Sequence, residues 1–209
     1  AFIFQAEISP HTMPVHLGHL NYQPSKLEEA VDKWHHDTIP LDYVMMVSDP
    51  ATLSGGGFEY FLGTKMEAEE LSKQGKTPPR DRVKAPKFPG PGYAVALHGN
   101  MVVHRGAPLT KPGERITMVN AYVSMDCLVD DQSRSRDLIG IDDPAALYAE
   151  WAKHASWRTQ NRLQQIIDSM AFDQEPDQVL DQLEFAANDL IKTINDMKAG
   201  PREAQHYEQ

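Results

Sequence analysis

The apolar positions in the first two thirds of the chain fall into short runs that are rich in β-branched and aromatic residues. Gly, Pro, Asn and Asp separate these runs, as is typical of turns between strands. The sequence therefore predicts strands in AFIFQAEI, MPVHLGHLNYQ, LDYVMMVS, GFEYFLG, GYAVALHG, MVVHRGA and RITMVNAYVSM. Many short strands with Gly- and Pro-rich turns favour a β-sandwich or barrel. Gly99-Asn100 predicts a tight hairpin turn between two of them.

Two helical patterns interrupt this β region. In SKLEEAVDKW, Ser25 and Glu28 have capping-box spacing, which predicts a short helix that ends just before His35. A second helix is predicted from Met66 to Gln74, followed by a stretch rich in Pro and charged residues. A long insertion of this kind is either a lid over a site or a solvated loop, so both interpretations stand for residues 65–92.

Helical periodicity dominates the last third of the chain. Asp143 is a predicted N-cap, Pro176 opens a second long helix, and Gly200 ends it. We therefore expect a β core in residues 1–141 and a helical extension, packed on that core, in residues 142–209. The apolar face of the second helix is expected to pack on the core, with a homodimer contact as the alternative.

Composition and charge narrow the classes of function. The 209 residues carry a formal net charge of −10, which argues against non-specific nucleic-acid binding. The single cysteine, Cys127, excludes an intramolecular disulfide and fits a reducing compartment. No apolar run is long enough to span a membrane. We expect a cytoplasmic protein that acts on a small molecule.

Candidate metal ligands lie in WHHDT and VVHRG. His35 and Asp37 are two residues apart, so their side chains point to the same face of an extended segment. His104 follows a later strand and is the candidate third ligand. His36 competes with His35, because an error of one residue in register exchanges the two. Two histidines and one carboxylate form the facial triad that is typical of non-haem Fe(II) oxygenases.

An arginine and a threonine complete the candidate chemistry. Arg115 and Thr117 are two residues apart on a predicted strand and share one of its faces. A 2-oxo dicarboxylic acid that chelates iron at one end leaves its other carboxylate inside an apolar core. A guanidinium is the best partner for such a buried carboxylate, and a threonine hydroxyl can donate a second hydrogen bond to it.

These residues resemble the pattern of the 2-oxoglutarate- and Fe(II)-dependent dioxygenases, including the phytanoyl-CoA-hydroxylase-like members. The family pattern H-x-D, a distal H and then R-x-S/T is matched by His35-x-Asp37, His104 and Arg115-x-Thr117. The resemblance covers about Gly18 to Val123. It implies a double-stranded β-helix (jelly-roll, cupin-like) core, with Fe(II), 2-oxoglutarate and O2 used to oxidise, most often hydroxylate, a substrate C–H bond with release of succinate and CO2.

The same resemblance places further residues. It implies that Gln23 contacts 2-oxoglutarate. Independently of the resemblance, Tyr43, Phe58 and Tyr60 are candidate walls of the substrate pocket. Asp37 argues against a halogenase, because halogenating relatives have a small residue at that position. The alternatives are an Fe(II) oxidase of the same fold that does not use 2-oxoglutarate, a cupin-like metalloenzyme without oxidation, and a non-catalytic binding protein.

Overall fold

The computed structural model describes residues 2–22, 27 and 29–208. Three residues named above, Gln23, Ser25 and Glu28, lie outside the described residues. The chain forms two compact units, which alternate along the sequence. A β unit comprises His16–Tyr122 and Ala204–Gln209, and a helical unit comprises Ala1–Val15 and Val123–Glu203. The predicted boundary between residues 141 and 142 stays a prediction.

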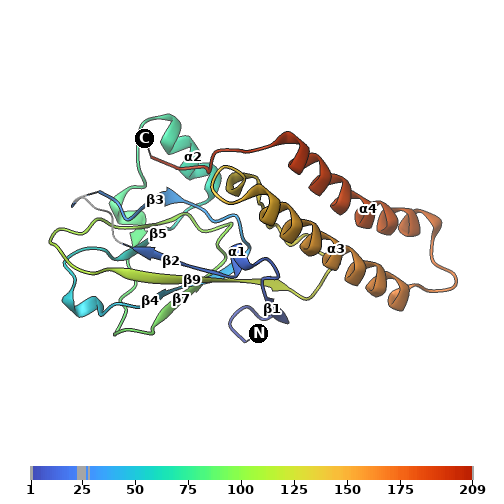
Figure 1. The fold of residues 1–209 in the computed structure, drawn as a ribbon, viewed down its shortest axis with the longest axis horizontal. Coiled ribbons are helices and arrows are strands. Elements are labelled where there is room, and N and C mark those ends of the chain that lie inside the picture. The colour runs from blue at the N-terminus through green and yellow to red at the C-terminus, as the bar shows by residue number, and fades with distance from the viewer. Residues whose placement is uncertain (1, 23–26, 28, 209) are drawn as a thin grey trace. The chain divides into compact units, whose positions relative to one another are not determined.

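The β unit contains a first antiparallel sheet with the long strand β9 in its middle (Figure 1). Within the β unit, the strands of this five-stranded sheet follow the spatial order β2 (Gly18–Tyr22), β9 (Ile116–Ser124), β4 (Leu41–Met46) and β7 (Ala94–Leu97). The register places Val44 opposite Val119 and Asn21 opposite Thr117. Alternate residues of β9 are buried, so this strand has one face toward the core, as the alternation of apolar residues in its sequence predicts.

A second antiparallel sheet in the β unit carries the residues predicted to bind metal. Its spatial order is β3 (Asp32–His35), β8 (His104–Gly106), β5 (Phe58–Phe61) and β6 (Val83–Lys84). In the register, His35 lies opposite His104, and His104 lies opposite Tyr60. The predicted ligands from two distant parts of the sequence thus lie on neighbouring strands.

The two faces of the second sheet bury different apolar clusters. On one face, Phe58 packs with Val44 and Val119 of the first sheet. On the other face, Trp34 and Phe61 belong to a cluster that also contains residues of the helix α2 (Lys65–Lys73). Successive residues of a strand point to opposite faces, so His35 lies on the face away from Trp34.

The helix α2 lies in the predicted insertion of residues 65–92, and its contacts hold this part of the insertion in place. Thr64 and Glu67 form a capping box at its start, and Ala68 is buried in the cluster below it. Arg82 donates hydrogen bonds to Leu62 O and to the Glu67 carboxylate. This part of the 65–92 segment is therefore anchored on the second sheet. The short η1 (Pro50–Thr52) and η2 (Arg80–Arg82) are 3-10 turns in the connections.

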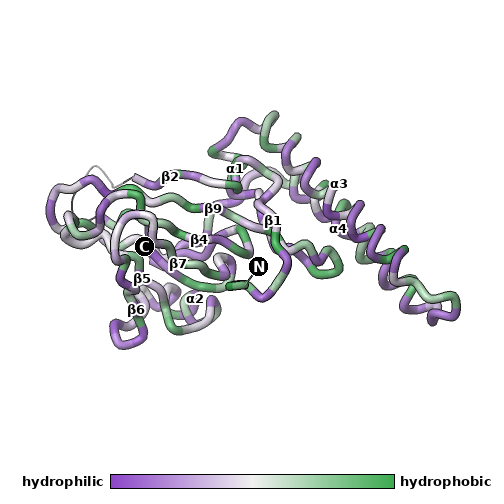
Figure 2. The backbone as a smooth tube through the Cα atoms, turned by 90° about the horizontal axis from the view of Figure 1, so that it is seen from below, coloured by the Kyte–Doolittle hydropathy of each residue, from purple (hydrophilic) through white to green (hydrophobic). Residues whose placement is uncertain are grey.

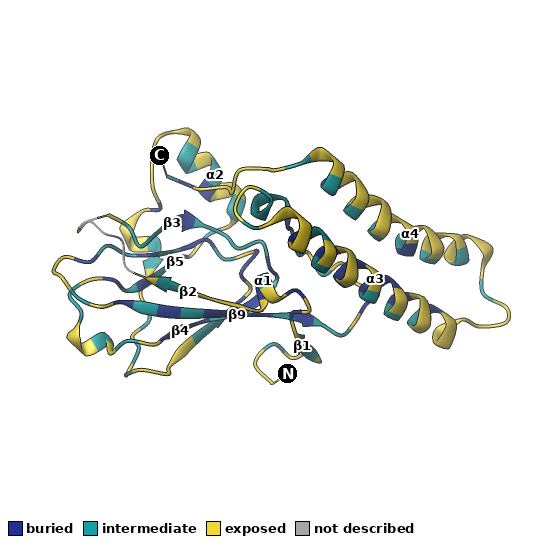
Figure 3. Ribbon diagram, viewed as in Figure 1, coloured by how far each residue is buried: buried dark blue, intermediate teal, exposed yellow. Residues whose placement is uncertain are grey.

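The helical unit is built around α3 (Pro144–Ser169) and α4 (Pro176–Ala199), with β1 (Ile8–Pro10) and η3 (Arg136–Leu138) before them, and the short α1 (Pro14–Leu17) begins in this unit and ends in the β unit. The predicted N-cap is confirmed, because the Asp143 carboxylate accepts a hydrogen bond from Ala145 N. Hydrophilic and hydrophobic residues alternate around both long helices (Figure 2). Eight residues of α3 are buried but only Ala186 of α4, and Figure 3 shows α4 mostly exposed.

Three local predictions were wrong. Asp32–His35 is a strand and not the end of a helix, because Trp34 is buried in a sheet whose packing overrides helix propensity. Residues 2–5 form turns instead of a strand. Gly99-Asn100 is a turn but not a hairpin, since β7 pairs with β4 and β8 pairs with β3 and β5, so the chain crosses between sheets there.

The fold class is confirmed at its coarser level: antiparallel sheets followed by two long helices. The double-stranded β-helix remains a prediction. Among the described residues, no helix combines the length and the apolar character that crossing a membrane requires.

Candidate metal centre

His35, Asp37 and His104 converge at the inner face of the second sheet. One possible ligand atom from each lies within 4.8 Å of the corresponding atoms of the other two. His35 Nε2 is 3.4 Å from Asp37 Oδ1, and His104 Nε2 is 3.5 Å from Asp37 Oδ2. The carboxylate therefore lies between the Nε2 atoms of the two rings. Two imidazoles and one carboxylate in this arrangement could hold a divalent metal ion.

The backbone orients both rings for this task. His35 Nδ1 lies 2.6 Å from Lys33 O, and His104 Nδ1 lies 2.9 Å from Val102 O. Because a carbonyl only accepts hydrogen bonds, each Nδ1 carries the hydrogen. The neutral form of each ring then presents an Nε2 lone pair toward Asp37. Such outer hydrogen bonds are typical of metal-binding histidines, since they fix both the tautomer and the ring orientation.

The surroundings of the two histidines shift their pKa values in opposite directions. Burial opposes protonation of His35, but the hydrogen bond with Asp37 and the negative charges of Asp32 and Asp37 outweigh it and raise the pKa of His35 to about 9. Burial is the dominant effect on His104 and lowers its pKa. At neutral pH the His35 ring of the metal-free site is therefore charged, and the proton on its Nε2 must leave before this atom can bind a metal.

A second carboxyl group, Asp42, lies beside Asp37. Asp42 is fully buried, and burial together with the charge of Asp37 raises the pKa of Asp42 far above its ordinary value. Asp42 is thus a carboxylic acid that can donate to Asp37. Both carboxyl groups border Gly99, where a Cβ atom would collide with the Oδ2 atoms of Asp42 and Asp37. Gly99 therefore leaves the space that this pair occupies, and its carbonyl accepts a hydrogen bond from Asp37 N at 2.8 Å.

Arg115 and Thr117 lie buried in the same β unit, each 2% exposed. Arg115 Nε donates to Gly56 O at 2.6 Å, and Arg115 Nη1 lies 3.4 Å from Thr117 Oγ1. Burial lowers the pKa of Arg115 to about 10, so the guanidinium remains charged at neutral pH. Gly56 is needed here, because a Cβ atom would approach the Arg115 side chain to 3.0 Å and the backbone has φ +70°.

One cavity between the two sheets contains both groups of residues. It contains about 430 Å³ of space between the protein atoms, including space open to solvent. Its lining includes the three converging residues together with Arg115 and Thr117. Apolar walls come from Val44, Phe58 and Val119, and further polar lining comes from His19, Asn21, Asp32 and Arg105. The cavity thus places a candidate metal centre and a buried cation at one site.

The residues predicted for the substrate pocket have different positions. Phe58 lines the cavity, and its ring centroid is 5.2 Å from that of His104. Tyr60 packs in the apolar cluster beside Phe58. Tyr43 lies beside Tyr122 on the opposite face of the first sheet from Val44, with ring centroids 6.1 Å apart. Neither tyrosine is among the described residues that line the cavity.

His36 is directed away from the cavity. Its Nδ1 is 2.8 Å from the hydroxyl of Tyr207, and it is not among the residues that converge on Asp37. Of the two adjacent histidines, His35 is therefore the one that the described structure brings to the site. Sequence reasoning did not find Asp42, although an acidic residue inside the apolar run LDYVMM was the available signal.

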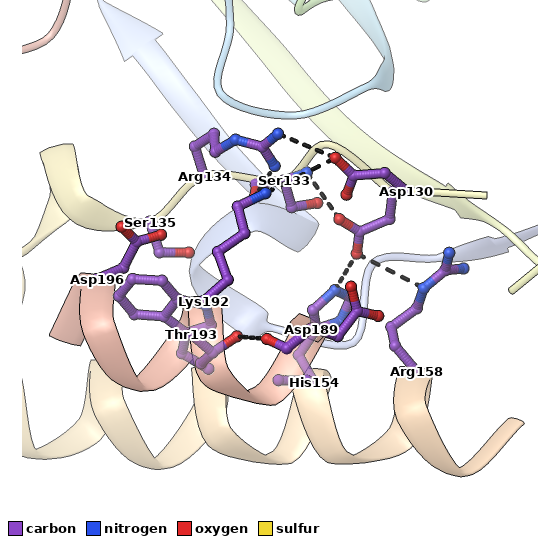
Figure 4. Close-up of a pocket in the computed structure, with 13 residues that line it drawn as sticks. Asp130, Ser133, Arg134, Ser135, His154, Arg158, Asp189, Lys192, Thr193 and Asp196 are labelled. Atoms are coloured by element: carbon purple, nitrogen blue, oxygen red, sulfur yellow. Dashed lines mark hydrogen bonds and ion pairs between the residues drawn. The ribbon is translucent and has the colours of Figure 1, made fainter. Parts of the chain in front are cut away.

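The helical unit contains a separate polar cavity (Figure 4). His154 Nε2 lies 2.5 Å from Asp131 Oδ2, and Arg158 Nε lies 3.8 Å from the same oxygen. Lys192 extends toward Asp130, with 3.7 Å between Nζ and Oδ2. These contacts join α3, α4 and the preceding loop, and such a paired network stabilises the arrangement of the helices within this unit.

Comparison with known proteins adds little to these observations. No protein-family model matches the chain, and no curated protein matches it. A solved structure of a non-heme monooxygenase, ThoJ, as a nickel complex is similar with 14% sequence identity and a TM-score of 0.39, covering 70% of this chain. The match spans 64% of the other protein, less than two thirds of its length. The chain is thus a mainly antiparallel β protein with two long helices and a His–Asp–His cluster that could hold a metal ion.

Proposed function

We propose that the protein is a non-haem iron oxygenase that uses 2-oxoglutarate and O2 to oxidise a C–H bond of a small molecule. The observation that carries this proposal is the single cavity lined by His35, Asp37 and His104 and also by the Arg115–Thr117 pair. A metal centre alone would fit many reactions. A buried guanidinium beside it favours an anionic co-substrate.

The residues fit a bound iron ion. Asp37 Oδ2 is buried, and no hydrogen-bond donor among the described residues reaches it apart from the acid of Asp42. A cation would satisfy this oxygen, and the two Nε2 atoms already face the Asp37 carboxylate, that of His35 at Oδ1 and that of His104 at Oδ2. His35, Asp37 and His104 would hold Fe(II). Iron would supply the binding of O2 and the redox chemistry that couples oxidation of the co-substrate to oxidation of the substrate.

Arg115 would bind the carboxylate of 2-oxoglutarate that does not face the metal. Its guanidinium is buried, is held in place by Gly56 O and remains charged, so little reorganisation is needed when the anion arrives. Thr117 would donate a hydrogen bond to the same carboxylate. Val44, Phe58 and Val119 would exclude water around the reacting groups. Overall, 2-oxoglutarate, O2 and R–H would give succinate, CO2 and R–OH.

The experiment is an anaerobic titration of the metal-free protein with Fe(II) and then with 2-oxoglutarate, followed by visible absorption. We expect a weak charge-transfer band from the chelated 2-oxo acid. His104→Ala should abolish the band by removing a ligand, and Arg115→Met should weaken 2-oxoglutarate binding by about 100-fold or more, since it removes a charged bidentate partner. Arg82→Met is the matched control, because Arg82 is fixed to Glu67 and Leu62 and is not among the residues lining the cavity.

Each contrary result has a definite meaning. Iron binding without the band would overturn the role of 2-oxoglutarate and favour an oxidase or a non-oxidative metalloenzyme. Absence of metal binding by the wild-type protein would overturn the enzyme proposal and favour a binding protein. An equal effect of Arg82→Met and Arg115→Met would remove the argument for a specific carboxylate site.

A further inference from the structure

The segment 204–208 returns to the β unit after α4 and pairs with β3. His206 forms an antiparallel bridge with His35, and Tyr207 N donates a hydrogen bond to Trp34 O at 2.7 Å. Trp34 N donates to the Glu208 carboxylate at 3.2 Å. The segment therefore continues the second sheet beyond β3, the strand that ends at the candidate metal ligand.

Tyr207 contacts both neighbours of His35. Its ring is 1% exposed and packs with Trp34 in one apolar cluster. Its hydroxyl lies 2.8 Å from His36 Nδ1, a nitrogen that can accept the hydroxyl hydrogen. Tyr207 thus holds residues 34 and 36 on the face of the sheet that lies away from the cavity.

Because side chains alternate between the two faces of a strand, this contact also restricts which histidine can face the metal centre. Successive residues of a strand point to opposite faces, and a shift of one residue exchanges the faces. The sequence presents two adjacent histidines, so a β3 shifted by one residue would turn His36 toward the cavity and would turn His35 and Asp37 away from it. Holding Trp34 and His36 on one face leaves His35 directed to the other.

We propose that Tyr207 is a positioning residue for the metal centre, and that its hydrogen bond with His36 selects His35 as the ligand. This inference rests on the proposed metal site, but it does not depend on 2-oxoglutarate or on any substrate. Tyr207 acts through β3 and is not among the residues that line the cavity.

The test uses the intact 209-residue chain and Co(II), whose visible ligand-field spectrum reports the ligands and their geometry. Tyr207→Phe keeps the buried ring and removes only the hydroxyl. It should weaken Co(II) binding by roughly three- to tenfold, the equivalent of one hydrogen bond, and should change the spectrum. Tyr148→Phe is the matched control, because it removes a hydroxyl that bonds to Met197 O at 2.9 Å in the helical unit.

Two substitutions of His36 test the same hydrogen bond from its other side. His36→Asn places an acceptor near the position of Nδ1 and should retain wild-type affinity and spectrum. His36→Leu removes the acceptor and should reproduce the effect of Tyr207→Phe, and the double variant should be no worse than either single one.

The outcomes separate this inference from the proposed function. If the wild-type protein binds Co(II), and Tyr207→Phe and His36→Leu match the Tyr148→Phe control in affinity and spectrum, the positioning role is overturned while the metal site stands. If Tyr207→Phe and His36→Leu have additive effects, the hydrogen bond between them is not the cause. Failure of the wild-type protein to bind Co(II) overturns both proposals.

Discussion

Metal binding by this protein should release one proton near neutral pH, and its affinity should rise with pH. Asp37 and Asp32 raise the pKa of His35 to about 9, whereas burial lowers that of His104. Only His35 therefore carries a proton that the metal must displace. Raising the pH removes this competing proton, so the sign of the effect is tighter binding at higher pH.

The magnitude follows from the distance between the working pH and the pKa of His35. At about pH 7, two units below the pKa of about 9, roughly one molecule in 100 has a neutral His35. The apparent affinity should be about 100-fold below its limit at high pH, equivalent to ~2.7 kcal/mol. Between about pH 6.5 and about pH 8 the affinity should increase about tenfold per unit.

Isothermal titration calorimetry with Co(II) can measure both effects. Titrations at one pH in buffers that differ in ionisation enthalpy give the number of protons released, which should be close to one. Asp32→Asn is the informative variant, because the Asp32 carboxylate lies 3.5 Å from His35 Nε2 and contributes to the raised pKa. In this variant the pH dependence should level off at a lower pH.

Two results would refute this reasoning. Release of no proton at about pH 7 would show that His35 is already neutral, and release of two protons would show that a second group, either His104 or the acid of Asp42, also loses a proton. An affinity that stays constant between about pH 6.5 and about pH 8 would exclude competition by any histidine of the site.

Three further substitutions or reactions test other parts of the structure. Gly99→Ala should weaken Co(II) binding by about tenfold or more, because the added methyl group collides with two buried carboxyl groups. Gly90→Ala is the control and should match wild type in the same titration, since a Cβ atom there would meet no other atom within 4 Å. Arg162→Met should destabilise the helical unit by about 3 kcal/mol in thermal unfolding, since this buried guanidinium donates to several backbone carbonyls; a change below ~1 kcal/mol would contradict that. Burial raises the pKa of Cys127, so iodoacetamide should modify it slowly in the native protein and rapidly in denaturant, and rapid native labelling would contradict its burial.

The sequence predicted the elements whose pattern is strong and local. Alternating apolar residues predicted β9, and Asp143 followed by a proline predicted the start of α3. The H-x-D spacing, together with a later histidine, identified the three residues that the structure brings together at the candidate metal centre. For the strand and the helix one stretch of sequence contained the whole signal, whereas the candidate metal ligands were found by combining two stretches that lie far apart in the chain.

Other parts of the site depend on contacts between distant residues. SKLEEAVDKW has good helix-forming residues, yet Asp32–His35 is a strand because it pairs with β8. Asp42 is a neutral acid only because folding buries it beside Asp37. The role of Tyr207 could not be predicted, because its hydrogen-bond partner His36 lies 171 residues earlier in the chain. Its packing partner Trp34 is similarly distant in the sequence.

That separation has a consequence for the order of folding. The segment 204–208 follows α3 and α4 in the sequence, so the ribosome completes both helices before the outer edge of β3 can be paired. Closing so long a loop costs more entropy than forming local turns, and contacts of large sequence separation form slowly. The strand that ends at His35 should therefore be one of the last parts of the β unit to become protected from hydrogen exchange during folding.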